Sequence, residues 1–275
     1  MNSFENFLTL LQTKMERPLP YGWYHWLWLG LTAATLVILI LLRKHNGEKQ
    51  LKWFLAIYGI VAAITELLKQ LSWSFSWDGG AVWNYQWYAA PFQLCSTPIY
   101  LSLICLFLKR GKLRNSLLSY LSLVSIIGGF MTIILPHSCF CSDILANVHT
   151  MWLHCGSFVL GVYLLISGNV TLTKQSWLRA AMVFLILAAT ALAMNIGVYQ
   201  SGILNDEVFN MFYISPYFES VLPVFIDLQK VVPYPIFLGL YLIAVLLGSG
   251  LVFWLAKGVA AGINKCKQRV LLHTR

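Results

Sequence analysis

A cysteine and a histidine in apolar surroundings are the residues of this sequence best suited to covalent chemistry. Cys95 lies between Pro91 and Pro98, and His154 lies in a later apolar run. A neighbouring imidazole can take the proton of a thiol and leave a thiolate nucleophile. Both residues fall about one to one and a half turns inside the same expected membrane boundary, so neighbouring helices would bring them together. The alternatives are a small apolar filler for Cys95 and a buried, carbonyl-bonded histidine for His154.

Four further polar side chains lie near the same boundary. Glu66 and Lys69 are three residues apart, which places them on one helix face. They form either a structural ion pair with Lys69 extended toward the interface, or part of a cavity lining. Asn195 and Gln93 are candidates for orienting an imidazole or stabilising an oxyanion, and the alternative for Asn195 is a hydrogen bond between helices.

The composition excludes a water-soluble globular protein. Of 275 residues, 59% are hydrophobic and 11% are charged, which is about half the usual charged share. The net charge of +9 could suggest a nucleic-acid partner. Because the basic residues fall in short loops between apolar runs, we interpret them as topology signals, and we expect membrane lipids, not nucleic acid, as partners.

Seven runs approach the roughly 20 apolar residues that a membrane-spanning helix needs. They are 23–42, 51–72, 91–108, 116–135, 149–167, 177–198 and 235–256. The predicted fold is an all-α polytopic membrane bundle that forms a single transmembrane domain over 1–275. The segment 199–234 reads as an outer loop with surface or re-entrant helices, since its apolar stretches are short. The first 15 residues have helical spacing, which fits an amphipathic surface helix or a frayed terminus.

Loop charges predict the orientation of the bundle. Alternate loops and the C-terminal tail carry an excess of basic residues, so they should be cytoplasmic, with the N-terminus outside and the C-terminus inside. These residues are Arg43, Lys44, Lys49, Lys52, Lys109, Arg110, Lys112, Arg114, Lys174, Arg179, Lys257, Lys265, Lys267, Arg269 and Arg275.

The histidines and loop cysteines make poor metal ligands. His149 and His154 are five residues apart and would face different sides of one helix. Cys139 and Cys141 lie in an outer loop, where they could be lipidated, oxidised or free thiols. We therefore predict no metal site and no cofactor.

Several short motifs follow the order found in a known family. The segment Ala90-Pro-Phe-Gln-Leu-Cys95-Ser resembles the Leu-Pro-Leu-His-Leu-Cys signature of the YwaF-type bacterial integral membrane proteins. The segments 153–156, 163–165, 211–216 and 233–235 are similar to later motifs of that family. The sequence departs from the signature at Gln93, where the bacterial proteins have histidine.

This resemblance implies a function. An animal branch of the family looks like a phospholipid acyltransferase, and its fold resembles membrane hydrolases that use a hydroxyl or thiol nucleophile and a histidine. Carried onto this chain, the nucleophile is Cys95 and the general base is His154. We therefore expect a phospholipid acyltransferase or lipid hydrolase in a bacterial plasma membrane, with its polar cavity opening to the outer leaflet.

Two other classes fit the same residues. A transporter or channel would use broken helices and intramembrane charge to line a path. A non-enzymatic assembly or binding protein would use its polar side chains only to join helices.

Overall fold

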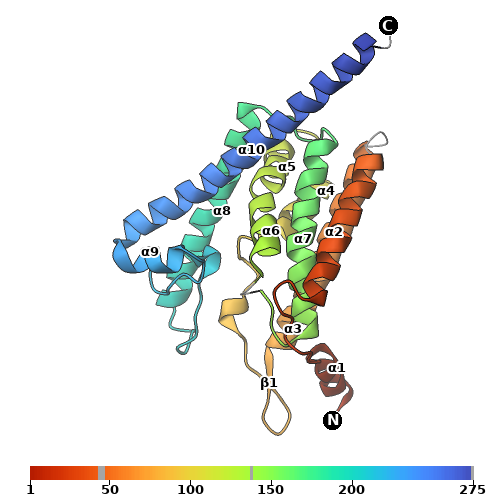
Figure 1. The fold of residues 1–275 in the computed structure, drawn as a ribbon. Coiled ribbons are helices and arrows are strands. Elements are labelled where there is room, and N and C mark those ends of the chain that lie inside the picture. The colour runs from red at the N-terminus through yellow and green to blue at the C-terminus, as the bar shows by residue number, and fades with distance from the viewer. Residues whose placement is uncertain (43–46, 137–138, 274–275) are drawn as a thin grey trace.

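The chain folds into a bundle of helices with one small hairpin (Figure 1). The computed structural model describes residues 1–42, 47–136 and 139–273, with side-chain surroundings up to residue 262. Within these ranges, six helices are long and apolar enough to cross a membrane. This confirms the predicted all-α polytopic membrane protein.

The long helices follow six of the predicted spans closely. They are α2 (Trp23–Leu41), α3 (Glu48–Trp73), α5 (Lys112–Leu123) continued by α6 (Ser125–Ile134), α7 (Ile144–Ile166), α8 (Lys174–Gln200) and α10 (Tyr234–His273). Runs of apolar residues of this length can satisfy every backbone group within one helix, which lipid requires.

The span predicted at 91–108 is helical only in its second half. Helix α4 is Thr97–Phe107, and Pro98 lies in its first turn, where a missing N–H has no cost. The predicted start of this helix at residue 91 was therefore wrong. Eleven residues cover about 16 Å of a hydrocarbon core about 30 Å thick. The preceding turns must complete the crossing, and such backbone is tolerated only where protein buries it.

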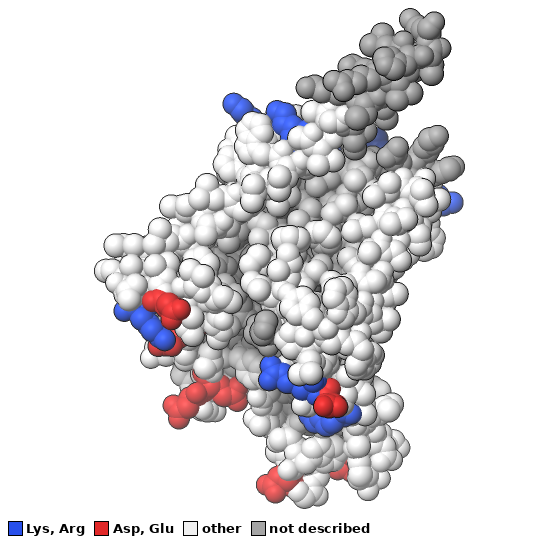
Figure 2. All heavy atoms as spheres, viewed as in Figure 1, with Lys and Arg blue, Asp and Glu red and all other residues white. Residues whose placement is uncertain are grey.

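The two ends of the bundle differ in charge. In Figure 1 helix α1 and the last turns of α10 lie at opposite ends of the bundle. This is the arrangement expected if the short helix α4 and the turns before it form a seventh crossing. On the face drawn in Figure 2, the Asp and Glu side chains lie in the lower half, together with several Lys or Arg, whereas the charged side chains at the upper end are Lys or Arg. We call these the N-terminal end and the basic end. The basic end is still predicted to be cytoplasmic; its residues Arg43 and Lys44, and the side chains from 263 onward, lie outside the described part.

An ordered cap covers part of the N-terminal end. Helix α1 (Ser3–Leu11) is confirmed over the frayed alternative, and the Asn2 side chain accepts a hydrogen bond from the Glu5 N–H to start it. The segment 73–90 contains a hairpin, β1 (Phe75–Trp77) with β2 (Ala81–Trp83), that the sequence did not indicate. The Gln12 amide donates to the carbonyls of Ser72 and Phe75, which ties α1 to this hairpin.

The segment 199–234 is largely irregular, as predicted, but it does not lie only on the surface. It contains a 3-10 turn, η4 (Met211–Tyr213), and the short helix α9 (Phe225–Val231). Met211, Phe212 and Ser215 are buried. The segment therefore folds back into the bundle.

Two glycines allow α7 to approach α6 closely. A Cβ at Gly161 would lie 2.3 Å from Ile126 Cγ1, and one at Gly129 would lie 2.5 Å from the His154 carbonyl oxygen. Both distances are shorter than any real carbon contact, so these positions have room only for hydrogen. This approach fixes the face of α7 that carries His154.

Candidate active site

Cys95 lies in a turn at the start of α4, deep between α3 and α7. It packs against a small cluster that includes Ala62 of α3, Ile99 of α4 and Leu153 of α7. Ala62 and Leu153 each lie one helical turn from a charged residue, Glu66 on α3 and His149 on α7. The contacts thus place the thiol about one turn deeper in the bundle than this charged pair.

Glu66 is the centre of a buried polar cluster. One carboxylate oxygen lies 2.8 Å from Lys69 Nζ and accepts a hydrogen bond from the Gln70 amide at 2.7 Å. The other oxygen lies 2.8 Å from His149 Nε2. The ion pair predicted for Glu66 and Lys69 is present, with His149 as a partner that the sequence did not reveal. Since Gln70 also donates to the Ala89 carbonyl, the cluster holds the chain that leads to Cys95.

Both ring nitrogens of His149 are engaged. Nδ1 lies 3.0 Å from the Thr65 hydroxyl, and Nε2 faces the Glu66 carboxylate. The second contact has the distance of an ion pair but not the angle of a directed hydrogen bond, so that carboxylate oxygen has no aligned donor. Nε2 must carry a proton, because two lone pairs at that distance would repel. His149 is therefore a positioning group for Glu66, and has no nitrogen left to accept a proton from another side chain.

His154 is placed differently. Its backbone lies against α6, since a Cβ at Gly129 would lie 2.5 Å from the His154 carbonyl oxygen, and its side chain is only partly buried. The structure thus places Cys95 about one turn from Glu66, and it places His154 next in sequence to Leu153, which shares the packing cluster of Cys95. Among the described residues no hydrogen bond joins the Cys95 thiol to the His154 ring, so their predicted pairing stays a prediction.

Gln93 and Asn195 hold the irregular segment 210–212 in place. Gln93 donates to the Asn210 carbonyl and accepts from the Phe212 N–H, both at 2.9 Å. Asn195 on α8 is fully buried; it donates to the Met211 carbonyl and accepts from the Met211 N–H. Asn195 therefore has the structural role that was its alternative interpretation. Its hydrogen-bond partner, however, is the backbone of a re-entrant segment and not another helix.

This clamped segment has a strained backbone. Phe212 and Tyr213 have φ angles of 58° and 57°, in the left-handed region that residues with a side chain rarely adopt. Such a conformation costs about 1–3 kcal/mol per residue and persists only where the surroundings enforce it. The side-chain amides of Gln93 and Asn195 hold the segment in this conformation. The conformation in turn sets where the Tyr213 side chain points.

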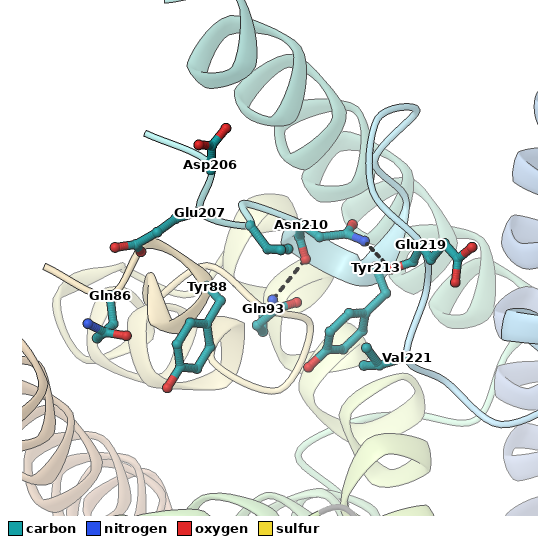
Figure 3. A pocket seen from close by; sticks show the side chains of 10 residues that line it. Gln86, Tyr88, Gln93, Asp206, Glu207, Asn210, Tyr213, Glu219 and Val221 are labelled. Carbon is teal, nitrogen blue, oxygen red and sulfur yellow. Dashed lines mark hydrogen bonds between the residues drawn. The ribbon is translucent and has the colours of Figure 1, made fainter. Parts of the chain in front are cut away.

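A pocket of about 510 Å³ opens beside this segment at the N-terminal end (Figure 3). Its lining residues are Gln86, Tyr88, Gln93, Asp206, Glu207, Val208, Asn210, Tyr213, Glu219 and Val221. Tyr88 is half exposed, and its phenol is a hydrogen-bond donor at neutral pH. Three carboxylates give the mouth a negative charge, and Gln93 and Tyr213 connect it to the depth of Cys95.

Four tyrosines lie in the part of the bundle that holds the thiol. They are Tyr58, Tyr120, Tyr213 and Tyr241, from α3, α5, η4 and α10. The Tyr120 hydroxyl is bonded to Thr97 at the start of α4, and the Tyr58 hydroxyl to Ser157. These hydroxyls are polar groups that could serve a reaction at Cys95, and the sequence reading did not include them.

Comparison with known proteins agrees with this architecture. A model of the TMEM164 family matches residues 20–253. The chain belongs to the TMEM164 family. The matched range runs from just before α2 into α10, so it contains Glu66, Lys69, Gln93, Cys95, His154 and Asn195. No curated protein and no solved structure shows significant similarity. The likeness to the YwaF-type proteins stays a prediction from short motifs.

His149 and the tyrosines illustrate what a linear reading misses for this TMEM164 family member. His149 was considered only as a metal ligand, and its spacing from His154 argued against that. Its partner Glu66 is 83 positions earlier, so no spacing rule could join them. A signal was present nonetheless, because an ionisable residue within a span needs a partner.

Proposed function

We propose that this TMEM164 family member is a membrane-embedded acyl-transfer enzyme, either a phospholipid acyltransferase or a lipid hydrolase, in which Cys95 is the nucleophile. The observation that carries the proposal is the position of Cys95. It lies just before the short helix α4 and packs against α3 and α7, and Gln93, two residues earlier, lines an open pocket. The thiol packs among apolar side chains, so a base must take its proton before it can attack.

His154 is the proposed general base. A base needs a ring nitrogen with an available lone pair, and His154 is next in sequence to Leu153, which packs in the same cluster as Cys95. His149 cannot take this role while it is held by Thr65 and Glu66. The choice between the two histidines therefore follows from the contacts of His149.

The reaction proceeds in two balanced steps. His154 accepts the thiol proton, and the thiolate attacks the ester carbonyl of a lipid, so that a C–S bond forms and the C–O bond breaks. The departing alkoxide takes the proton from His154. A lysolipid hydroxyl or water then attacks the thioester, gives its proton to His154 and releases the thiolate. No cofactor is required for either step.

A labelling experiment tests this proposal. Purified protein is incubated with a phospholipid that carries an alkyne-tagged acyl chain, and hydroxylamine-sensitive label on the protein is measured. Cys95→Ala and His154→Ala should each abolish the label while the protein remains monodisperse. Cys105→Ala removes another buried thiol of α4 and should keep the label.

Other outcomes favour the rival classes. Label that persists in Cys95→Ala, or that moves to another cysteine, overturns the assignment. If Glu66→Gln and Lys69→Met abolish the passage of a solute while Cys95→Ala is silent, the protein is a transporter. If every variant only lowers stability, the polar residues serve assembly.

A further inference from the structure

A groove at the basic end, far from Cys95, has the features of a lipid site. A cavity of about 330 Å³ lies where α3 begins and α4 ends. Lys49 and Lys52 line it on one side, Trp53 stands beside them, and Ala56 with Leu106 forms an apolar floor. The groove thus combines two cations with an apolar base.

The two lysines have no counter-charge within the described residues. The nearest acid in the chain, Glu48, is already bound by two cations: Arg110 at 3.0 Å and the buried Arg114 at 2.6 Å. Lys49 and Lys52 also fall in the first turns of α3, where the helix dipole disfavours positive charge. An anion in the groove would supply the missing counter-charge and would also interact favourably with the helix dipole.

The surroundings of the groove favour a ligand with acyl chains over a free ion. Below the lysines, the exposed residues Trp53, Ile57, Ile60, Ile64 and Leu67 form one stripe along α3. On α4, Ile104 and Phe107 are exposed in the same way. The apolar floor therefore continues onto faces that meet lipid, so an acyl chain can lie along them while its headgroup stays between the lysines.

The groove is also preformed. The ion pairs of Glu48 join the start of α3 to the start of α5, just after α4 ends. Gly59 brings α3 close to α4, since a Cβ there would lie 2.6 Å from the Ser102 hydroxyl. Both walls of the groove are thus held without a ligand.

We propose that this groove binds an anionic phospholipid, with the phosphate between Lys49 and Lys52 and one acyl chain along Ala56 and Leu106. Trp53 is the interfacial aromatic that such a site would use. The site is separate from the proposed acyl transfer and does not depend on it. Basic pockets at the cytoplasmic side of transmembrane helices are known to bind anionic headgroups in this way.

Native mass spectrometry of the full chain in detergent tests the proposal. Retention of phosphatidylglycerol is compared with that of phosphatidylcholine with identical chains. The double variant Lys49→Gln/Lys52→Gln should bind phosphatidylglycerol about 30-fold more weakly, since each lysine near the membrane contributes a factor of about five. The matched control Lys174→Gln/Arg179→Gln removes two charges from the same end but from α8, and it should retain wild-type affinity.

A second variant and a competitor separate the lipid from a free anion. Ala56→Phe keeps both charges but fills the floor, and it should weaken phosphatidylglycerol binding severalfold. Millimolar inorganic phosphate should not displace the lipid. The proposal is overturned if the control loses as much binding as the lysine variant, if both lipids are retained equally, or if inorganic phosphate displaces the lipid.

Discussion

Breaking the ion pair of Glu66 should destabilise the protein far more than breaking an exposed pair. Glu66 and Lys69 have side chains that are 7% and 13% exposed. Glu66→Gln keeps the shape of the side chain but leaves the Lys69 ammonium buried without a counter-charge. Removing one partner of a buried pair costs about 3–5 kcal/mol, whereas an exposed pair contributes about 0–1 kcal/mol.

A double-mutant cycle isolates this effect. Lys69→Met should also be destabilising, because it leaves the carboxylate with only His149 and Gln70. The double variant Glu66→Gln/Lys69→Met buries no charge at either position, so it should be more stable than the Glu66→Gln single variant. We expect a coupling energy of about 2–3 kcal/mol.

The assay is reversible unfolding in bicelles by a denaturing detergent, followed by tryptophan fluorescence, for which the chain has 11 tryptophans. Lys14→Met/Asp143→Asn is the control, since Lys14 is 67% exposed and its pair should contribute little. The reasoning is refuted if Glu66→Gln lowers the free energy of unfolding by less than about 1 kcal/mol. It is also refuted if the double variant is no more stable than the Glu66→Gln single variant. Water would then be screening the cluster.

Three further predictions follow from named contacts. Asn195→Leu leaves both backbone groups of Met211 unpaired, so it should lower the free energy of unfolding by about 2–5 kcal/mol and expose the 210–220 segment to proteolysis. Gly161→Ala puts a methyl group against Ile126, which should cost about 1–3 kcal/mol in the same unfolding assay. The backbone N–H at the start of α1 lowers the pKa of Glu5 below its ordinary 4.5. The capping contribution is therefore complete above that pH and is lost as the pH falls through the folded-state pKa, which amide exchange in α1 would report.

The positions of the spans could be predicted from the sequence because lipid imposes a simple rule. Every backbone group within the membrane must be bonded, so runs of about 20 apolar residues become helices wherever they occur. The loop charges could also be read segment by segment, and they predicted that one end of the bundle is basic. The sequence was less informative at 91–96, since the turns there are apolar enough to read as helix and only burial by the rest of the protein makes them possible.

The candidate residues were visible in the sequence, but their relations were not. Cys95, His154, Glu66 and Lys69 stood out because each is chemically unusual within an apolar run. Which histidine is available as a base depends on the contacts of His149 with Thr65 and Glu66. Those contacts join residues on different helices, so no local pattern encodes them.

The sequence by itself determined that this chain crosses a membrane several times, because hydropathy and loop charge act on each segment separately. Only the tertiary structure decided that Gln93 and Asn195 hold a re-entrant backbone. It also decided that His149 is bound to Glu66 and that Cys95 lies one turn deeper in the bundle. The physical reason is that buried polar groups take whichever partner the packing of distant helices brings within reach, and that packing is a property of the whole bundle.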